Sequence, residues 1–209
     1  MERSSCSDIL LKIFLSVLVL TGVGSCSENV PDDPVLYQKL LDETVGMTKE
    51  KSVNGVTLKS QYQPPELLAL INSKGSSGNF QKALEEYNNQ MSFVLLVESK
   101  EEGEDILTRG LQGYEDYQSR VQLLNFEIKD YITLEVGGRR LKPVLGTMEN
   151  TYGLRTGRKL IVVFAGHPED LLQKNTEFDL IFQDPVFGTG INRFRYTTSD
   201  ILNAPLPQT

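Results

Sequence analysis

Residues 131–145 limit the possible folds more than any other part of the chain, because they specify one β-hairpin in one register. Gly137-Gly138 supplies two adjacent residues that tolerate positive φ, as a two-residue hairpin turn requires. The register then pairs Leu134 with Leu141, Glu135 with Arg140, and Val136 with Arg139. One face of this hairpin becomes apolar and the other carries a charge pair directly across the strands. We therefore expect an antiparallel sheet here.

Five further segments have strand patterns. Residues 56–62, 178–183 and 192–196 alternate apolar and polar side chains, as strands with one buried face do. Residues 91–97 and 160–165 are almost continuously apolar, which predicts strands covered on both faces. Short strands with Gly-rich turns, without a regular alternation of strands and helices, favour a sandwich or barrel. We expect a mainly β protein with a few short helices, arranged as an immunoglobulin-like β-sandwich.

Helices are expected between these strands. Helical spacing of apolar side chains, or a Pro suited to the first helical position, predicts short helices over residues 35–43, 65–71, 80–89 and 114–124. From Phe126 onward we expect strands.

The start of the chain has the features of a secretory signal. An apolar run over residues 13–20 follows Arg3 and Lys12, and it is too short to cross a bilayer, which needs about 20 apolar residues. The run ends in Val23-Gly24-Ser25, directly before Cys26. This order of charged, apolar and small residues is typical of a signal peptide that is later removed.

The stretch Val23-Gly24-Ser25-Cys26 resembles the lipobox of bacterial lipoproteins. The resemblance implies that residues 1–25 are removed and that Cys26 becomes the new N-terminus. Its sulfur would carry a diacylglycerol and its amine an acyl chain, which together hold a protein on a membrane. Ordinary secretory cleavage after Ser25 is the alternative. Downstream of this signal the domain resembles no family that we recognise.

The residues after Cys26 give a second hint about location. Position 27 is Ser, whereas an Asp there would imply retention at the inner membrane, so the resemblance favours the outer membrane. The acidic residues Glu28, Asp32 and Asp33 are similar to the surface-export signal of Bacteroidota lipoproteins. Soluble, extended tethers have the same composition, so the domain could face the periplasm or the cell surface.

Cysteine use and charge narrow the possible chemistry. Cys6 and Cys26 are the two cysteines of the sequence, so the domain after them must rely on its hydrophobic core rather than on disulfides. A formal net charge of -7 argues against nucleic acid as a partner. We divide the chain into a signal peptide (1–25), a tether with a short helix (26–50), a β-rich domain (51–203, sandwich core about 90–202) and a tail (204–209).

Three titratable residues are candidates for catalytic groups. His167, the single histidine, follows a core strand beside two acidic residues and could act in acid–base chemistry, but the same residues suit the start of a helix. Asp179 and Asp184 lie five positions apart, so on a strand they would point to opposite faces, and Asp184 before Pro185 suits a turn. We expect no enzyme, no catalytic residue, no metal site, and no cofactor besides the lipid on Cys26.

Two sets of residues are candidates for a binding surface. The first is a basic set that could meet an anionic partner, or could instead form a solvated sheet face paired with Glu135 and Glu149. The basic set comprises Arg139, Arg140, Lys142, Arg155 and Arg158. The second is a set of tyrosines for glycan contact: Tyr114, Tyr117, Tyr131 and Tyr152. Tyr114 and Tyr117 also suit one face of a helix.

These features predict a lipid-anchored protein of the bacterial outer membrane that acts by non-catalytic binding or assembly. Its expected partners are the membrane, through the lipid, and an envelope protein or glycan. Two alternatives remain open. A surface glycan-binding or adhesin-like module predicts exposed, coplanar tyrosines and a groove. An envelope hydrolase predicts His167 in a cleft, with a carboxylate within hydrogen-bond distance.

Overall fold

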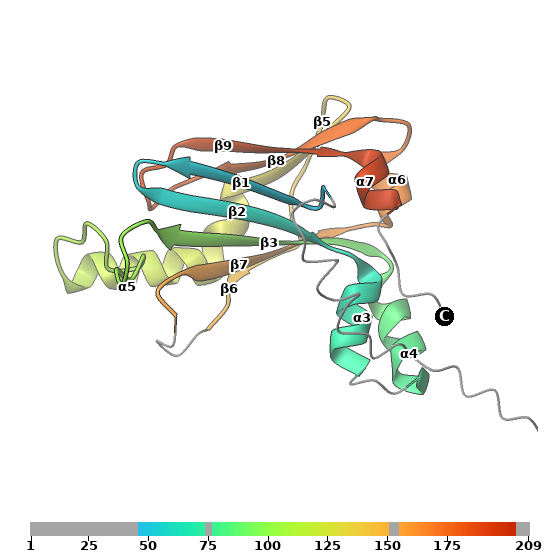
Figure 1. The fold of residues 1–209 in the computed structure, drawn as a ribbon, viewed down its shortest axis with the longest axis horizontal. Helices are drawn as coiled ribbons and strands as arrows, with labels where there is room; N and C mark the ends of the chain where they lie inside the picture. The colour runs from blue at the N-terminus through green and yellow to red at the C-terminus, as the bar shows by residue number, and fades with distance from the viewer. Residues whose placement is uncertain (1–45, 74–76, 151–154, 204–209) are drawn as a thin grey trace, which may run out of the picture.

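The computed structural model describes residues 46–73, 77–150 and 155–203. Several predicted features lie outside these residues: the signal peptide (1–25), Cys26, the helix at 35–43, Tyr152 and the tail (204–209). The described residues form a mainly β protein with two antiparallel sheets and a few short helices (Figure 1).

Nine strands lie within the described ranges. Their bounds are β1 Thr48–Val53, β2 Val56–Gln63, β3 Gln90–Ser99, β4 Ile132–Val136, β5 Arg139–Leu141, β6 Leu145–Met148, β7 Arg158–Ala165, β8 Glu177–Gln183 and β9 Ile191–Thr197. The order β1-β2-β3-β7-β6 forms a five-stranded sheet, called sheet A below. The order β5-β4-β8-β9 forms a four-stranded sheet, called sheet B.

The helices are short and connect the strands. Their bounds are α3 Pro65–Ser73, α4 Ser77–Tyr87, α5 Tyr114–Gln122, α6 Pro168–Leu172 and α7 Thr198–Leu202. Directly after α5, the chain forms a π-helical turn over Leu123–Glu127 and a 3₁₀ turn over Ile128–Tyr131.

The predicted hairpin is confirmed with its register. Leu134 pairs with Leu141, Glu135 with Arg140, and Val136 with Arg139. Gly137 and Gly138 form the turn at φ values of 55° and 80°, a region that side chains other than glycine rarely adopt. Local turn chemistry therefore fixed this part of sheet B.

The expectation of strands from Phe126 onward is wrong, because the chain stays helical up to Tyr131. The reason is a core contact: Leu124 and Ile128 lie four positions apart and are both fully buried. That spacing places two side chains on one face of a helix, where both can reach the core. The helices predicted from residues 65, 80 and 114 are present as α3, α4 and α5.

Strand β1 was not predicted, and it begins slightly before residue 51, the expected start of the β-rich domain. Its sequence TKEKSV lacks alternating apolar residues because it is the edge strand of sheet A. The Lys49 and Lys51 ammonium groups each lie 5.8 Å from a ring centroid, of Tyr196 and Phe194 respectively. Lysines on an edge strand also discourage pairing with other chains.

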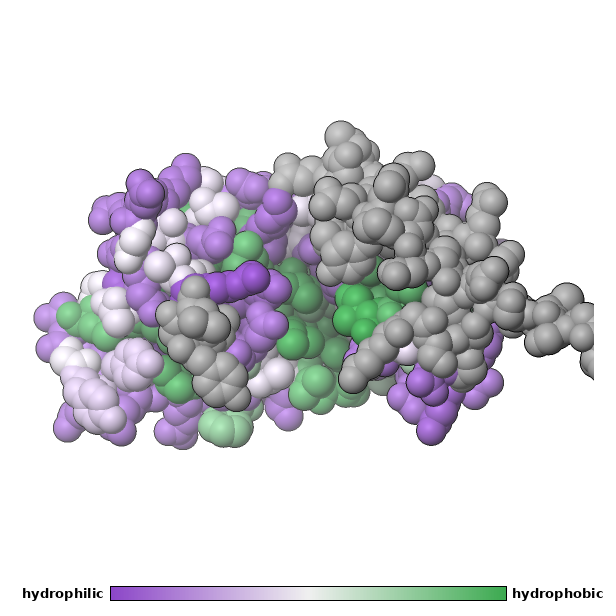
Figure 2. Space-filling model, turned by 60° about the horizontal axis from the view of Figure 1, so that its bottom comes forward, coloured by the Kyte–Doolittle hydropathy of each residue, from purple (hydrophilic) through white to green (hydrophobic). Residues whose placement is uncertain are grey.

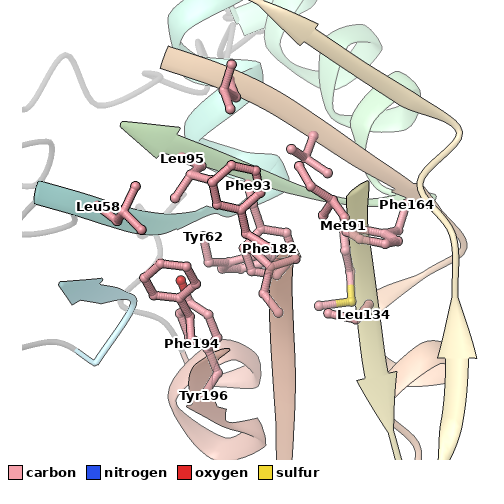
Figure 3. Packing of buried hydrophobic residues seen from close by; sticks show 14 of the residues in the cluster. Leu58, Tyr62, Met91, Phe93, Leu95, Leu134, Phe164, Phe182, Phe194 and Tyr196 are labelled. Atoms are coloured by element: carbon pink, nitrogen blue, oxygen red, sulfur yellow. The ribbon is translucent and has the colours of Figure 1, made fainter. Parts of the chain in front are cut away.

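The two sheets share one hydrophobic core. Alternate residues of β2, β3 and β7 belong to the same buried cluster as alternate residues of β4, β8 and β9. The Phe93 ring lies at its centre (Figure 3), with centroids 5.4 Å from Tyr62 and 6.1 Å from Phe164 in sheet A. Across the core its centroid lies 6.4 Å from Phe178 and 5.6 Å from Tyr196 in sheet B. This ring therefore joins the two sheets.

The outer face of sheet A is more exposed than the sequence suggested. Strands β3 and β7 were expected to be covered on both faces, yet their outward residues Val94, Leu96, Ile161 and Val163 are only half-buried. Neighbouring Leu145 on β6 is 48% exposed. Hydrophobic surface is visible in the middle of Figure 2, in which the bottom of Figure 1 comes forward. One face of each of these strands packs on the shared core. The other face is apolar in sequence but is only partly covered in the structure.

Replacing Phe93 with Ala should lower the free energy of unfolding by about 3–5 kcal/mol, the usual cost of truncating a large buried ring. The cavity would lie between the two sheets and would remove contacts on both sides. Because the chain has no Trp, urea unfolding is best followed by circular dichroism. Phe93→Leu should lose clearly less. A loss below about 1 kcal/mol for the Ala variant would contradict the central position of this ring.

Candidate binding sites

The predicted basic set does not form one patch. Arg158 is 6% exposed on the core side of β7, and its Nη2 lies 2.6 Å from Oδ2 of Asp105. Arg155 lies nearby and is exposed. Arg140 and Lys142 lie in the other sheet, on and directly after β5. Of the five residues, only Arg140 and Lys142 can therefore contribute to one shared binding surface.

Arg139 also points away from that pair. Its Nη2 donates a hydrogen bond of 2.8 Å to the carbonyl oxygen of Leu171, at the end of the hairpin. It therefore connects the hairpin to α6.

Arg140 and Lys142 line a hollow on the outer face of sheet B, called the β5 hollow below. Tyr131 lines it too, so the hollow brings together members of the basic set and of the tyrosine set. Arg193 from β9 and Asp130 add further charged groups, and the volume is about 160 Å³. The hollow can receive a small polar group but not a large ligand.

An ion-pair network neutralises much of the charge beside this hollow. Glu135 lies between Arg140, at 3.2 Å, and Arg193, at 3.4 Å. The buried carboxylate of Asp179 accepts hydrogen bonds from Arg195 at 3.0 and 3.2 Å and from Arg193 at 3.4 Å. The hydrogen bonds from Arg195 lower the pKa of Asp179, although burial acts in the opposite direction. The arginines therefore stabilise the sheet face as well as charging it.

Lys142 differs from these arginines. Its Nζ donates a hydrogen bond of 2.7 Å to the carbonyl oxygen of Asp130. Within the three described ranges, no carboxylate lies within 4.0 Å of this ammonium group. Its charge is thus available to an anionic group at the rim of the β5 hollow.

The tyrosines do not form a flat platform. Tyr114 and Tyr117 lie on α5 and stack on each other, with centroids 6.4 Å apart and ring planes 19° apart. Tyr114 is 72% exposed, whereas Tyr117 is half-buried against the core. Tyr131 lies elsewhere, in the β5 hollow, so the three described tyrosines do not share one surface.

Asp184 forms a turn, as predicted. Its Oδ1 accepts hydrogen bonds of 2.8 Å from the backbone of Val186 and Phe187, and its Oδ2 accepts bonds of 2.7 Å from the amide and hydroxyl of Thr189. Asp179 is held by arginines on the outer face of sheet B. The two carboxylates thus have separate structural partners.

His167 lines a second hollow, called the Tyr62 hollow below, with a volume of about 220 Å³. Its Nδ1 accepts a hydrogen bond of 3.3 Å from the Glu169 amide and so caps the N-terminus of α6. In the described part of the chain, no carboxylate lies within hydrogen-bond distance of this imidazole. The pairing that a hydrolase was expected to have is therefore not found there.

Sequence reasoning missed the other polar groups of the Tyr62 hollow. They are Tyr62, Glu66 and Asn88, and they come from β2, α3 and the loop before β3. No spacing in the sequence relates them to His167, because packing at the end of the sheets brings these segments together.

The described residues contain neither a cluster of metal ligands nor a membrane-spanning helix. In these ranges, no group of three or more His, Cys, Asp or Glu side chains is placed to hold a metal ion. Of the helices described, none combines the length and the apolar character needed to cross a membrane.

Comparison with known proteins gives little guidance. No family model matches the chain, and no curated protein is similar to it. One similar solved structure is a protein of unknown function from Burkholderia pseudomallei K96243, with 11% sequence identity and a TM-score of 0.39. The match covers 80% of this chain and 86% of that chain. A likeness at this level carries no argument about fold or function.

Replacing Asp179 with Asn should destabilise the protein by about 1.5–3 kcal/mol at neutral pH, because charged hydrogen bonds from Arg195 and Arg193 are lost. The folded-state pKa of Asp179 is lowered, so its contribution is present above the unfolded pKa of about 3.9 and is lost as pH falls through the folded pKa. The difference between the native protein and the variant should therefore shrink below about pH 3.

Urea unfolding of both proteins at several pH values measures this difference. Glu177→Gln is a matched control, because Glu177 is an exposed carboxylate on the same strand and pairs with Arg195 at 3.7 Å. It should change the free energy of unfolding by less than about 1 kcal/mol. A loss for Asp179→Asn that is equal at acid and neutral pH would contradict the role given to the Asp179 charge.

Proposed function

We propose that this chain is a lipid-anchored protein of the bacterial outer membrane that acts by non-catalytic binding or assembly. The observation that carries the proposal is the stretch Val23-Gly24-Ser25-Cys26 directly after a short apolar run. Two or more acyl chains on Cys26 give stable anchoring, whereas one chain gives only marginal binding. The first described strand begins at Thr48, well after Cys26, which leaves a segment of chain between the lipid and the folded domain.

We further propose that the two sheets form an immunoglobulin-like β-sandwich. Two antiparallel sheets with a common core support this arrangement, since face-to-face sheets interleave side chains from their inner faces. The contacts of Phe93 with Phe178 and Tyr196 have this character. Such a scaffold leaves its outer faces free for partners.

The β5 hollow is the proposed contact for an anionic group of the partner. Lys142 supplies an ammonium group, and the Arg140 side chain is 72% exposed although it pairs with Glu135. An envelope protein that presents a carboxylate or phosphate is the favoured partner. A glycan is the second candidate, since the Tyr131 ring lies beside these cations and Tyr114 is exposed.

Cys26→Ser should release the protein from the membrane fraction, because the variant lacks the sulfur that carries the diacylglycerol. Fractionation of cells that express either form measures the release. Mass analysis of the native mature protein should give an N-terminus at Cys26 with the added mass of the lipid. A mature protein that begins elsewhere, or carries no lipid, would reduce the proposal to an exported domain.

Lys142→Glu should weaken capture of the partner from solubilised envelopes, because a negative charge would face the partner's anionic group. Native capture should also fall as salt rises, since exposed charges are screened. Lys82→Glu, an exposed lysine on α4 outside the β5 hollow, is the matched control and should leave capture unchanged. Equal capture by native protein and the Lys142 variant would exclude the β5 hollow as the contact.

A further inference from the structure

The Tyr62 hollow is lined by residues from the end of β2 and from α3, α6 and α7. Tyr62 is at the end of β2, Glu66 is in the first turn of α3, and His167 and Glu169 are at the start of α6. Ile201 from α7 contributes an apolar side to the lining. The hollow thus combines convergent polar groups with an apolar wall, as small-ligand sites do.

The hydroxyl of Tyr62 is a buried polar group of this hollow. Its side chain is 2% exposed, and within the described ranges no group forms a hydrogen bond with its hydroxyl. Tyr62 nevertheless lines the hollow. Buried hydroxyls in proteins are normally hydrogen-bonded. This one is positioned to bond with a molecule in the hollow.

The charged residues that line the Tyr62 hollow favour a cationic ligand over an anionic one. Glu66 and Glu169 contribute two carboxylates, and the described lining contains no Lys or Arg. Burial raises the pKa of Tyr62, and the negative charge of Glu66 raises it further, so the hydroxyl stays neutral. An anionic ligand would be repelled by both carboxylates, whereas a cation would be attracted.

The hydrogen-bonding groups agree with this selection. The Glu66 carboxylate, the Tyr62 oxygen and the amide oxygen of Asn88 can each accept a hydrogen bond. An ammonium group has three donors and no acceptor, so it fits a set of acceptors of this kind. The volume of about 220 Å³ is below the range of about 300–1,000 Å³ for drug-sized ligands, and suits a group the size of a side chain.

We propose that the Tyr62 hollow binds a primary ammonium group on a short aliphatic stem. Glu66 supplies the opposite charge, the Tyr62 hydroxyl accepts a hydrogen bond from the ammonium group, and Ile201 contacts the stem. The group belongs either to a free small amine or to a lysine side chain of a partner protein. This site goes beyond the anchoring and the β5 hollow, and it does not depend on either.

The test is a titration of the mature protein, extracted from the membrane in detergent, with n-butylamine, followed through the amide NMR signals around the hollow. We expect saturable shifts at Glu66, Asn88 and His167, with a Kd in roughly the millimolar range for so small a ligand. Neutral n-butanol, which has a similar shape, should not saturate these signals. Absence of saturable shifts with the amine, or equal binding of the alcohol, would overturn the proposal.

Variants identify the groups that bind. Glu66→Gln should weaken binding of n-butylamine by about tenfold, since it removes the opposite charge but keeps the shape. Tyr62→Phe should weaken it several-fold, since it removes only the hydroxyl. Glu85→Gln, an exposed carboxylate on α4 outside the hollow, is the matched control and should bind normally. Unchanged affinity in Glu66→Gln would also overturn the proposal.

A last pair of ligands separates the two sources of the amine. A short peptide with a free lysine is compared with the same peptide carrying an Nε-acetylated lysine, which has no charge. Binding of the free form alone supports the proposal with a partner's lysine as the source. Binding of n-butylamine without binding of either peptide supports it with a free amine as the source. These titrations involve no membrane, so their failure is distinguishable from failure of the lipid anchor.

Discussion

The contact between the two sheets at Phe93 is the constraint on which the rest of this structure depends. After Cys26 the chain has no cysteine, so no disulfide can hold the sheets together and the core must do so. Phe93 contacts Phe178 and Tyr196 from the opposite sheet. The hydroxyls of Ser60 and Tyr196 also form a buried hydrogen bond of 2.7 Å across the core. Ring packing is tolerant of small rotations, whereas this bond is directional, so together they fix the relative position of the sheets and of the groups on their outer faces.

The parts of the fold that the sequence predicted are those set by local chemistry. Gly137-Gly138 determines a turn and therefore a register, and both are observed. Strand β1 was missed because an edge strand needs no apolar alternation: Lys49 and Lys51 lie over aromatic rings of the core edge instead. The helical turns before Tyr131 were missed for a different reason. Leu124 and Ile128 have helical spacing, but two positions alone do not distinguish a helical turn from the start of a strand.

For the candidate sites too, the sequence predicts what depends on local pattern and not what depends on tertiary packing. Arg158 was placed among surface cations, yet it lies on the core side of β7 in phase with Leu160 and Val162. Its alternation with those residues is visible in the sequence and predicts an inward arginine paired with a carboxylate, which in the structure is Asp105. By contrast, Tyr62 and His167 are separated by about half of the chain, and their meeting depends on how α6 packs at the end of β2. A hollow of this kind depends on tertiary packing, so residue types and spacing could not predict it.

The two hollows have opposite charge and lie at different positions on the domain. The proposed lipid anchor would affect both through the orientation of the domain and its local concentration. Gly46 lies 20 positions after Cys26, and an extended chain of that length spans at most about 70 Å. This reach exceeds the width of a domain of this size, so an anchor at Cys26 would not fix which face points toward the membrane. Anchoring would instead raise the local concentration of both hollows near other envelope components. The proposed weak contacts, an anion at the β5 hollow and an ammonium group at the Tyr62 hollow, would then be sufficient, because such an anchor would confine the two partners to one surface.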